Sequence, residues 1–239
     1  PVFQNRTGEL MRAIRDEGAH VGRTYGQTKD TKGGTFLSSY ARTLTNGGLR
    51  FHTDRTDVVG LLCVRQAMKG GVSTIASTPA IHNAILAKRP DLLDALFTDY
   101  WRSRFGEEGT GKDGSSTTRA TAYPLPIFGV VDGKFTSHYS LTFIEAAQLA
   151  DDIPKLSAAQ KEAIDVLMAT AQELCFEMTL EPGDLQLINS HVTYHGRTPF
   201  EDDADSGHDR LLLRLSLMNM SAAAFTPVIS SWVVSLLVE

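Results

Sequence analysis

His52, Asp54 and His195 are residues of the types that hold a catalytic metal ion. His52 and Asp54 flank a single threonine, and His195 lies far downstream. In an extended segment, residues two apart point to the same side, so His52 and Asp54 can both reach one ion. Two imidazoles and one carboxylate form the ligand set of non-haem Fe(II) oxygenases, which leaves positions open for a co-substrate and O2. Because the chain has seven histidines, the His-Thr-Asp triplet alone is weak evidence, and its surroundings must decide.

The third ligand has two candidates, His191 and His195. A helix would place them one turn apart, as in zinc proteases. However, no glutamate follows His191, and the intervening Val-Thr-Tyr favours a strand. A strand would turn both histidines to one face. The spacing alone therefore leaves either histidine as the third ligand.

Arg210 and Arg214 predict an anion site near the metal. The strand pattern that follows Arg210 places four leucines on one face: Leu211, Leu213, Leu215 and Leu217. The two arginines share the other face, about 13 Å apart at roughly 3.3 Å per residue. If that face lines a barrel interior, an unpaired arginine is costly there, and anionic ligands would offset the cost. The alternative is that both arginines pair with nearby acids, namely Glu201, Asp202 or Asp203.

Short apolar runs predict the strands that would carry these residues. We expect strands at 58–64, 72–76, 127–131, 134–141, 185–189, 192–194 and 211–217. Asp132-Gly133 predicts a two-residue hairpin turn, and Gly70-Gly71 predicts a turn into the strand at 72–76. Many short strands with a few inserted helices indicate a mainly β protein with flanking helices, in the α+β class. The architecture expected is an antiparallel barrel or jelly roll.

Helical signals are fewer than strand signals. We expect helices at residues 9–17, from Thr78 to before Pro90, from Asp91 onwards, and from Ser157 toward Met178. The first rests on Leu10, Met11 and Ile14 at helical spacing, followed by Gly18 as a C-cap. The last begins with the capping box Ser157-Ala-Ala-Gln160, and its apolar stripe predicts core packing.

Segment 106–121 is polar and glycine-rich without apolar periodicity, which predicts a flexible loop or lid within a single domain, 1–239. The C-terminal segment 227–239 is apolar but about half the length needed to span a bilayer, so we expect a packing strand or a contact in a homo-oligomer. The chain begins at Pro1 rather than Met, which suggests a trimmed or incomplete N-terminus.

Composition excludes some partners. The 239 residues are 42% hydrophobic and 21% charged with a formal net charge of -5, so the chain lacks the basic footprint of nucleic-acid or anionic-membrane binding. A small-molecule partner fits better. Cys63 and Cys175 lie in apolar surroundings without metal-type spacing, which predicts buried free thiols of a reducing compartment, the cytoplasm. No signal peptide or membrane span is recognised.

The ordered set of motifs resembles the taurine dioxygenase (TauD/TfdA-like) family of Fe(II)/2-oxoglutarate-dependent oxygenases. The set comprises His52-Thr-Asp54, Gly70-Gly71-Val-Ser73, His195-Gly-Arg197 and Arg210-Leu-Leu-Leu-Arg214, and it extends over residues 48–217. The resemblance implies a double-stranded β-helix, a jelly roll of the clavaminate synthase-like type. It also implies Fe(II) as cofactor and 2-oxoglutarate and O2 as co-substrates.

The resemblance also assigns roles to residues. It makes His52, Asp54 and His195 the iron ligands, and it favours His195 over His191. Arg210 would hold the distal carboxylate of 2-oxoglutarate. Ser73, with Thr74 as its rival, would make a second co-substrate contact. Arg214 would hold the acidic group of the primary substrate or, alternatively, the 2-oxoglutarate carboxylate nearer the metal.

The family chemistry implies oxidation of a primary substrate with release of succinate and CO2. The oxidation is a hydroxylation, a desaturation or a ring closure, and the sequence does not choose among them. Because Arg214 offers a fixed cation on the inward face, we expect a small carboxylate or amino-acid-like substrate. His138 and Tyr139 are candidates for lining its pocket, with structural packing as the alternative. The polar residues that taurine-using relatives carry before the His-x-Asp motif are replaced by Leu49-Arg50-Phe51, which argues against taurine.

Two other function classes remain open. A non-redox jelly-roll metalloenzyme, such as a zinc hydrolase or isomerase, could use the same two histidines and aspartate. A metal-free binding module would retain the fold without turnover. Neither class needs Arg210 facing inward beside Ser73, and the oxygenase does.

Overall fold

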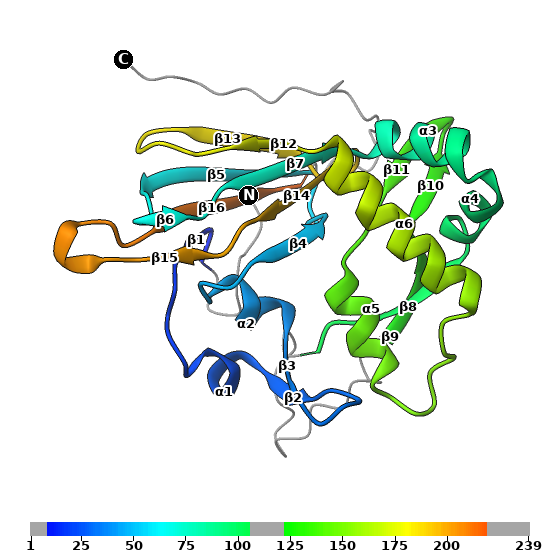
Figure 1. The fold of residues 1–239 in the computed structure, drawn as a ribbon, viewed down its shortest axis with the longest axis horizontal. Coiled ribbons are helices and arrows are strands. Elements are labelled where there is room, and N and C mark those ends of the chain that lie inside the picture. The colour runs from blue at the N-terminus through cyan, green and yellow to red at the C-terminus, as the bar shows by residue number, and fades with distance from the viewer. Residues whose placement is uncertain (1–8, 106–121, 219–239) are drawn as a thin grey trace.

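Two four-stranded antiparallel sheets form the centre of the computed structural model, which describes residues 9–105 and 122–218 (Figure 1). The first sheet has the order β1 (Met11–Ile14), β16 (Leu211–Leu217), β5 (Val58–Arg65) and β13 (Leu185–Asn189). The second has the order β12 (Phe176–Met178), β7 (Ser73–Ser77), β14 (Thr193–Arg197) and β4 (Leu49–His52). Strands distant in sequence are neighbours in both sheets, which confirms the mainly β jelly roll predicted.

The inner faces of the two sheets pack against each other. Val59 of β5, Ile188 of β13 and Ile75 of β7 form one buried cluster. The Ser73 hydroxyl of β7 also donates a hydrogen bond to Gln186 Oε1 of β13, at 3.1 Å. Because side chains alternate along a strand, the residues that share a face with Ile75 also point between the sheets. The space between the sheets is therefore where the inward side chains of β14 and β16 meet.

Three helices cover the outer face of the second sheet. α3 (Thr78–Lys88), α4 (Pro90–Leu96) and α6 (Ala158–Leu174) contribute buried side chains to one large core cluster. The sheet side of this cluster includes Phe51, Ala76 and Tyr194. α6 begins as predicted, because Ser157 and Gln160 exchange the two hydrogen bonds of a capping box. The helices thus hold β4, β7 and β14, the strands that position the metal candidates.

The remaining elements flank this centre (Figure 1). They are α1 (Val21–Tyr25), β2 (Gln27–Lys29), β3 (Thr35–Leu37), α2 (Ser39–Thr43), β6 (Lys69–Gly70), β8 (Asp99–Ser103), β9 (Ala122–Pro126), β10 (Phe128–Val131), β11 (Lys134–Ser137), α5 (Leu141–Gln148), β15 (Phe200–Glu201) and a short 3₁₀ helix at Ala204–Ser206. β10 and β11 form the predicted hairpin, with Asp132 and Gly133 both at positive φ.

Three predictions of secondary structure were wrong in whole or in part. The helix predicted from Ser157 toward Met178 ends at Leu174, because Phe176–Met178 forms β12. Residues 9–17 do not form a helix, because Met11–Ile14 pairs with β16 as an edge strand. In that strand Arg12 and Ile14 are buried, an alternation that the short run of apolar residues did not distinguish from helical spacing. The strand predicted at 134–141 ends at Ser137, and Leu141 begins α5. The predicted lid at 106–121 and the apolar segment 227–239 lie outside the described residues.

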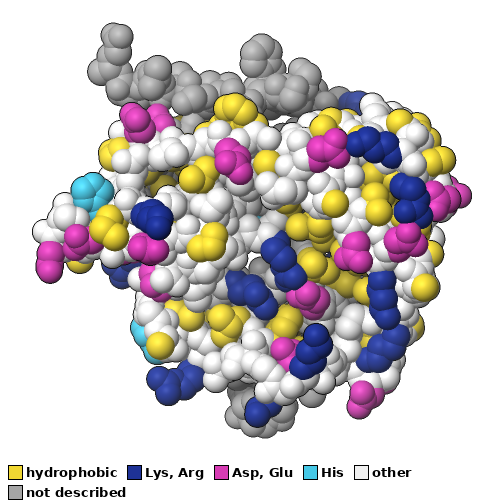
Figure 2. Space-filling model, viewed as in Figure 1, with side chains coloured by type: hydrophobic (Ala, Val, Ile, Leu, Met, Phe, Trp, Pro, Cys, Tyr) yellow, Lys and Arg dark blue, Asp and Glu magenta, His cyan; other side chains and the backbone are white. Residues whose placement is uncertain are grey.

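The surface and the cysteines agree with the composition. On the face in Figure 2, Lys and Arg side chains are interspersed with Asp and Glu. Within 9–105 and 122–218, no helix has both the length and the apolar character to cross a membrane. Cys63 is buried as predicted, whereas Cys175 is only half-buried, and both are free.

Gly70 is expected to tolerate no side chain. Its φ is +76°, and an added Cβ would collide with the carbonyl oxygen of Pro199. We expect Gly70→Ala to lower the free energy of unfolding by about 3 kcal/mol or more, measured by urea denaturation. Gly133→Ala is the matched control, because Gly133 has a similar φ of +73° but open space around it. The control should lose only about 1–2 kcal/mol, the cost of the backbone conformation. Equal losses in the two variants would contradict the steric argument.

Candidate metal centre

His52, Asp54 and His195 come together between the two sheets. His52 ends β4 and pairs with His195 of the neighbouring strand β14, so their rings lie side by side with centroids 4.2 Å apart. Asp54 follows two residues after His52. One ligand atom from each residue lies within 4.8 Å of the others, so a single ion can bridge them with small side-chain adjustments. These three are the one such group of His, Cys, Asp and Glu found among the described residues.

The protonation states of this group suit a metal. Burial lowers the pKa of His195 to about 3, with a further contribution from His52, so its imidazole is neutral at pH 7. The Nδ1 of His52 donates to the Arg50 carbonyl oxygen at 2.9 Å, which leaves Nε2 for a ligand. Burial alone would raise the pKa of Asp54, but Arg214 and the two histidines lower it to about 2. Neutral imidazoles and an ionised carboxylate are the forms that bind metal.

Arg214 lies against the carboxylate of Asp54. Its Nη2 is 3.4 Å from Asp54 Oδ1, and both side chains are largely buried. The Nε2 of His195 lies 3.9 Å from the other carboxylate oxygen, Asp54 Oδ2. Asp54 is therefore fixed by a cation on one side and by the second histidine on the other.

A first cavity beside the metal group has a strongly cationic lining. Arg197, Arg210 and Arg214 line it together with His52, Asp54, Ser73, His195 and several apolar side chains. Arg210, Leu212 and Arg214 all face this cavity, which confirms the predicted alternation along β16. The leucines of the opposite face are half-buried rather than firmly packed. Among the described lining residues, three arginines face one carboxylate.

The arginines of this cavity are only partly paired with the described residues: Arg214 contacts Asp54, and the Nη2 of Arg197 donates to the carbonyl oxygens of Thr45 and Gly47. Arg210 Nη1 and both Nε and Nη1 of Arg197 are buried and find no hydrogen-bond partner within the described part of the chain. Burial lowers the pKa of Arg210 to about 10 and that of Arg197, which also feels Arg210, to about 9. The alternative pairing with nearby acids is not formed by Arg210, since Asp202 instead accepts from its backbone N–H. Buried guanidinium N–H groups that find no partner among the described residues fit an anionic ligand with more than one carboxylate.

Ser73 and Thr74 point to opposite sides of β7. Ser73 lines the first cavity, on the same face as Ile75. Thr74 belongs to the other face and does not line the cavity. Instead, its hydroxyl would lie 2.9 Å from a Cβ added at Gly196. The structure therefore favours Ser73 over Thr74 for a contact with a ligand in this cavity.

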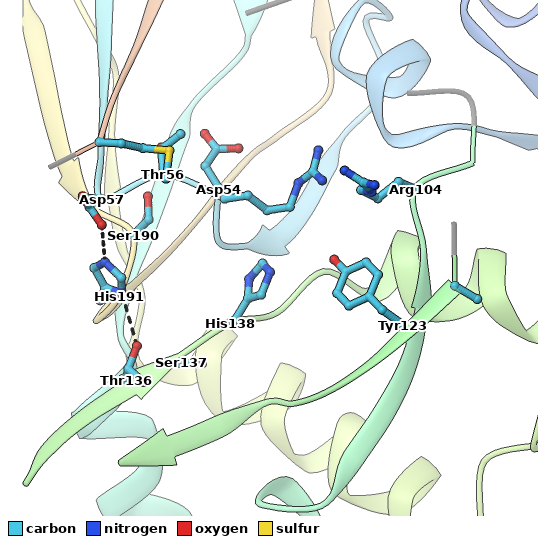
Figure 3. Close-up of a pocket in the computed structure, with 13 residues that line it drawn as sticks. Asp54, Thr56, Asp57, Arg104, Tyr123, Thr136, Ser137, His138, Ser190 and His191 are labelled. Atoms are coloured by element: carbon cyan, nitrogen blue, oxygen red, sulfur yellow. Dashed lines mark hydrogen bonds and ion pairs between the residues drawn. The ribbon is translucent and has the colours of Figure 1, made fainter. Parts of the chain in front are cut away.

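A second cavity, of about 750 Å³, lies on the other side of Asp54 (Figure 3). Among the described residues, Asp54 is the one that lines both cavities. The second is lined by loop residues after β4, by the end of β8, the start of β9, β11, and the turn between β13 and β14. In Figure 3 the side chains of Arg104, Tyr123 and His138 point into it.

The structure separates the other residues that the sequence singled out. His138 lines the second cavity, and its Nδ1 bonds the Thr53 hydroxyl at 3.0 Å. Tyr139 is fully buried in the helix-covered core and lines neither cavity, so the predicted substrate contact is not supported for this residue. His191 is held by Asp57 at 2.7 Å and does not join the metal group.

Several cavity residues went unrecognised in the sequence. Arg197 was considered only as a neighbour of His195, and Arg55, Arg104 and Tyr123 were not considered. Arg55 directly follows Asp54, which was a usable signal. Arg104 and Tyr123 flank the glycine-rich segment and reach the site only because β8 pairs with β9. The pairing of β8 with β9 cannot be predicted from the sequence of either segment alone.

Comparison with known proteins gives one family. Residues 2–216 match the family model described as taurine catabolism dioxygenase TauD, TfdA family. FR-33289 synthase of Streptomyces rubellomurinus is 34% identical over 221 residues, which cover 90% of this chain and 58% of that protein. The taurine hydroxylase-like protein SAT17 of Stachybotrys chartarum is 28% identical over 175 residues, covering 72% of this chain and 42% of that protein.

Solved structures with the same fold include two non-haem iron oxygenases. An asparagine oxygenase complexed with Fe(II), hydroxyasparagine and succinate superposes with a TM-score of 0.65 at 20% identity, covering 91% of this chain and 59% of that one. The oxygenase OrfP, complexed with Fe and α-ketoglutaric acid, superposes with a TM-score of 0.58 at 18% identity, with the same two coverages. The fold is thus the predicted double-stranded β-helix. The chain spans between 42% and 59% of the length of these four proteins.

Proposed function

Because the chain belongs to the taurine catabolism dioxygenase TauD, TfdA family, we propose that it is an Fe(II)- and 2-oxoglutarate-dependent oxygenase. It oxidises a small carboxylate or amino-acid-like substrate: 2-oxoglutarate loses CO2 and takes up one oxygen atom of O2 to give succinate, and the other oxygen atom oxidises the substrate. Relatives of the same fold point in this direction, since the structures of asparagine oxygenase and OrfP contain hydroxylated amino acids and succinate.

One observation carries the proposal: the metal group and a cavity with three arginines share Asp54 and both histidines as lining residues. A zinc hydrolase or a metal-free binding module does not require, beside the metal group, buried guanidiniums whose N–H groups find no partner among the described residues. A dicarboxylate co-substrate chelated beside the histidines would supply those partners.

We assign the following roles to the residues of the first cavity. His52, Asp54 and His195 would hold Fe(II), which supplies the O2 activation that side chains do not provide. Arg210 binds the distal carboxylate of 2-oxoglutarate, and Ser73 adds a hydroxyl contact in the same cavity. Arg214, placed against Asp54, orients the co-substrate carboxylate near the metal rather than the primary substrate. Arg197 lines the same cavity and adds a third positive charge to it.

The test is anaerobic addition of Fe(II) and then 2-oxoglutarate, with visible absorption as the readout. We expect a metal-to-ligand charge-transfer band that appears only when both are present. Arg210→Ala should abolish the band at co-substrate concentrations that saturate the wild type. A wild-type protein that binds Fe(II) but gives no band would rule out the co-substrate.

We also propose that the protein acts in the cytoplasm on a small molecule, without nucleic acid. The two free thiols and the mixed surface charge support this proposal. A homo-oligomer is a further proposal, which sedimentation velocity would test directly.

A further inference from the structure

Arg197 lies on the same strand face as the proposed metal ligand His195. The two residues are two positions apart in β14, and β14 pairs in regular register with β7 over this stretch. Their side chains therefore point to the same side, about 6.6 Å apart at roughly 3.3 Å per residue. Both line the first cavity. A ligand that chelates the metal and extends along β14 would meet the Arg197 guanidinium a few carbon atoms away.

Two further donors reach the same part of the cavity from neighbouring strands. Ser73 of β7 is the direct cross-strand partner of Arg197, and residues paired in this way have Cβ atoms about 5 Å apart. Arg210, which precedes β16 in the other sheet, packs its side chain against Gly71, where an added Cβ would lie 3.0 Å from Arg210 Nε. Because Gly71 is two residues before Ser73, the Arg210 side chain enters the cavity near Ser73.

The ring of Phe200 contacts both guanidiniums. Its centroid lies 4.7 Å from the guanidinium carbon of Arg197 and 5.2 Å from that of Arg210, distances typical of cation–π contacts. Phe200 is buried, and its backbone is fixed by pairing with Gly70 and by a hydrogen bond from its N–H to the Asn46 carbonyl oxygen, at 3.0 Å. Two guanidiniums of like charge repel each other, whereas the ring attracts both. Phe200 can therefore hold the pair in place before an anion binds.

Both guanidiniums keep N–H groups for a ligand. The Nη2 of Arg197 donates to the carbonyl oxygens of Thr45 and Gly47, which anchors one corner of the group. Its Nε and Nη1, and the Nη1 of Arg210, are buried and have no partner among the described residues. A carboxylate has two oxygen atoms and about four acceptor sites, so it can accept from two guanidiniums at once. The arrangement thus fits a single carboxylate bound by both arginines.

We propose that Arg197 and Arg210 jointly bind the distal carboxylate of 2-oxoglutarate, with Phe200 as the positioning residue that holds the two guanidiniums. This inference rests on the proposed function, which names the co-substrate. It goes beyond the family resemblance, which gives that carboxylate to Arg210 and assigns no role to Arg197 or Phe200. Two cations for one carboxylate make the distal group a determinant of selectivity, because a 2-oxo acid that lacks it would leave the buried N–H groups without an acceptor.

The test compares 2-oxoglutarate with 2-oxopentanoate, in which a methyl group replaces the distal carboxylate. Dissociation constants are measured from the charge-transfer band of the anaerobic Fe(II) protein and by calorimetry on the metal-free protein. We expect the wild type to bind 2-oxoglutarate at least about 100-fold more tightly than 2-oxopentanoate. Arg197→Gln should weaken 2-oxoglutarate about 10- to 100-fold and change the dissociation constant of 2-oxopentanoate by less than about 3-fold.

Further variants separate a positioning role from a structural one. Phe200→Leu should weaken 2-oxoglutarate about 3- to 10-fold without affecting 2-oxopentanoate, and Phe200→Tyr, which retains the ring, should bind both acids like the wild type. Arg197→Lys keeps the charge but not the paired N–H groups, so its loss should be smaller than that of Arg197→Gln. Arg23→Gln, at an exposed position of α1, is the matched control and should leave both constants unchanged.

The two protein forms distinguish a failure of this inference from a failure of the proposed function. If Fe(II) binds but neither acid gives the band, the proposed function fails, and the metal-free titration decides the inference. A preference for 2-oxoglutarate that Arg197→Gln removes supports the inference in either form. Equal weakening of both acids in Arg197→Gln would show a structural role and overturn it. A preference that survives this substitution, or a wild type that binds both acids equally, would also overturn it.

Discussion

Replacing Asp54 by alanine is expected to lower the rate of succinate formation by about 10³-fold or more, equivalent to about 4 kcal/mol of activation free energy. Asp54 is the single carboxylate of the metal group, and its low pKa keeps it ionised at pH 7. Without it, only the two imidazole ligands remain, and neither carries the negative charge that balances a divalent ion. Fe(II) affinity should therefore fall together with turnover.

The same substitution is expected to weaken the metal-free protein. Arg214 lies 3.4 Å from Asp54 and would keep its buried charge without that partner. Removing one member of a largely buried ion pair should lower the free energy of unfolding by about 2–4 kcal/mol. Thermal unfolding with and without Fe(II) separates the two effects, since only the wild type should be stabilised by the metal.

Asp151→Ala is the matched control, because Asp151 is exposed and lines neither cavity. It should change neither turnover nor unfolding by more than experimental error. Turnover retained in Asp54→Ala would instead support the metal-free binding module or a different metal site.

Much of the fold was readable from local sequence signals. The hairpin at Asp132-Gly133 and the capping box at Ser157 are short-range chemistry, and both form as predicted. β16 matches its predicted span, because the alternation of leucines persists over seven residues. Residues 11–14 were misassigned, since four residues are too few to separate a helical period from a strand period. There the pairing with β16 decides the conformation.

Those residues of the candidate site that lie in sequence motifs could be predicted from the sequence. His52 and Asp54 are close in sequence, and the structure brings His195 to them through a cross-strand pair. Choosing His195 over His191 depended on the family resemblance, and the structure gives the physical reason: His191 is engaged by Asp57. The second cavity was not predicted, because Arg104 and His138 directly follow two different strands, β8 and β11, whose pairing and packing no local pattern encodes.

Replacing Arg210 by methionine is expected to raise the dissociation constant for 2-oxoglutarate by about 100-fold, or about 2.7 kcal/mol. Arg210 is buried beside Phe200, with its guanidinium carbon 5.2 Å from the ring centroid. Its Nη1 has no partner in the described residues, so a co-substrate carboxylate is the natural acceptor. Methionine retains much of the volume and the contact with Phe200 but removes the donors.

The same variant should be no less stable than the wild type when no ligand is present. Burying a guanidinium without a counter-ion costs free energy, and an apolar side chain of similar length avoids that cost. We expect the free energy of unfolding to stay equal or to rise by about 1–2 kcal/mol, while stabilisation by 2-oxoglutarate disappears.

Arg65→Met provides the comparison, because Arg65 lies opposite Leu211 in the neighbouring strand and forms an exposed ion pair with Asp209. Because exposed ion pairs contribute little to stability, this variant should unfold at about the same denaturant concentration as the wild type and keep its response to 2-oxoglutarate. A large loss of stability in ligand-free Arg210→Met would mean that the arginine holds the fold together. A gain in stability combined with lost co-substrate binding would mean that the buried charge of Arg210 lowers the free energy of unfolding of the ligand-free protein. The arginine would then serve ligand binding rather than stability.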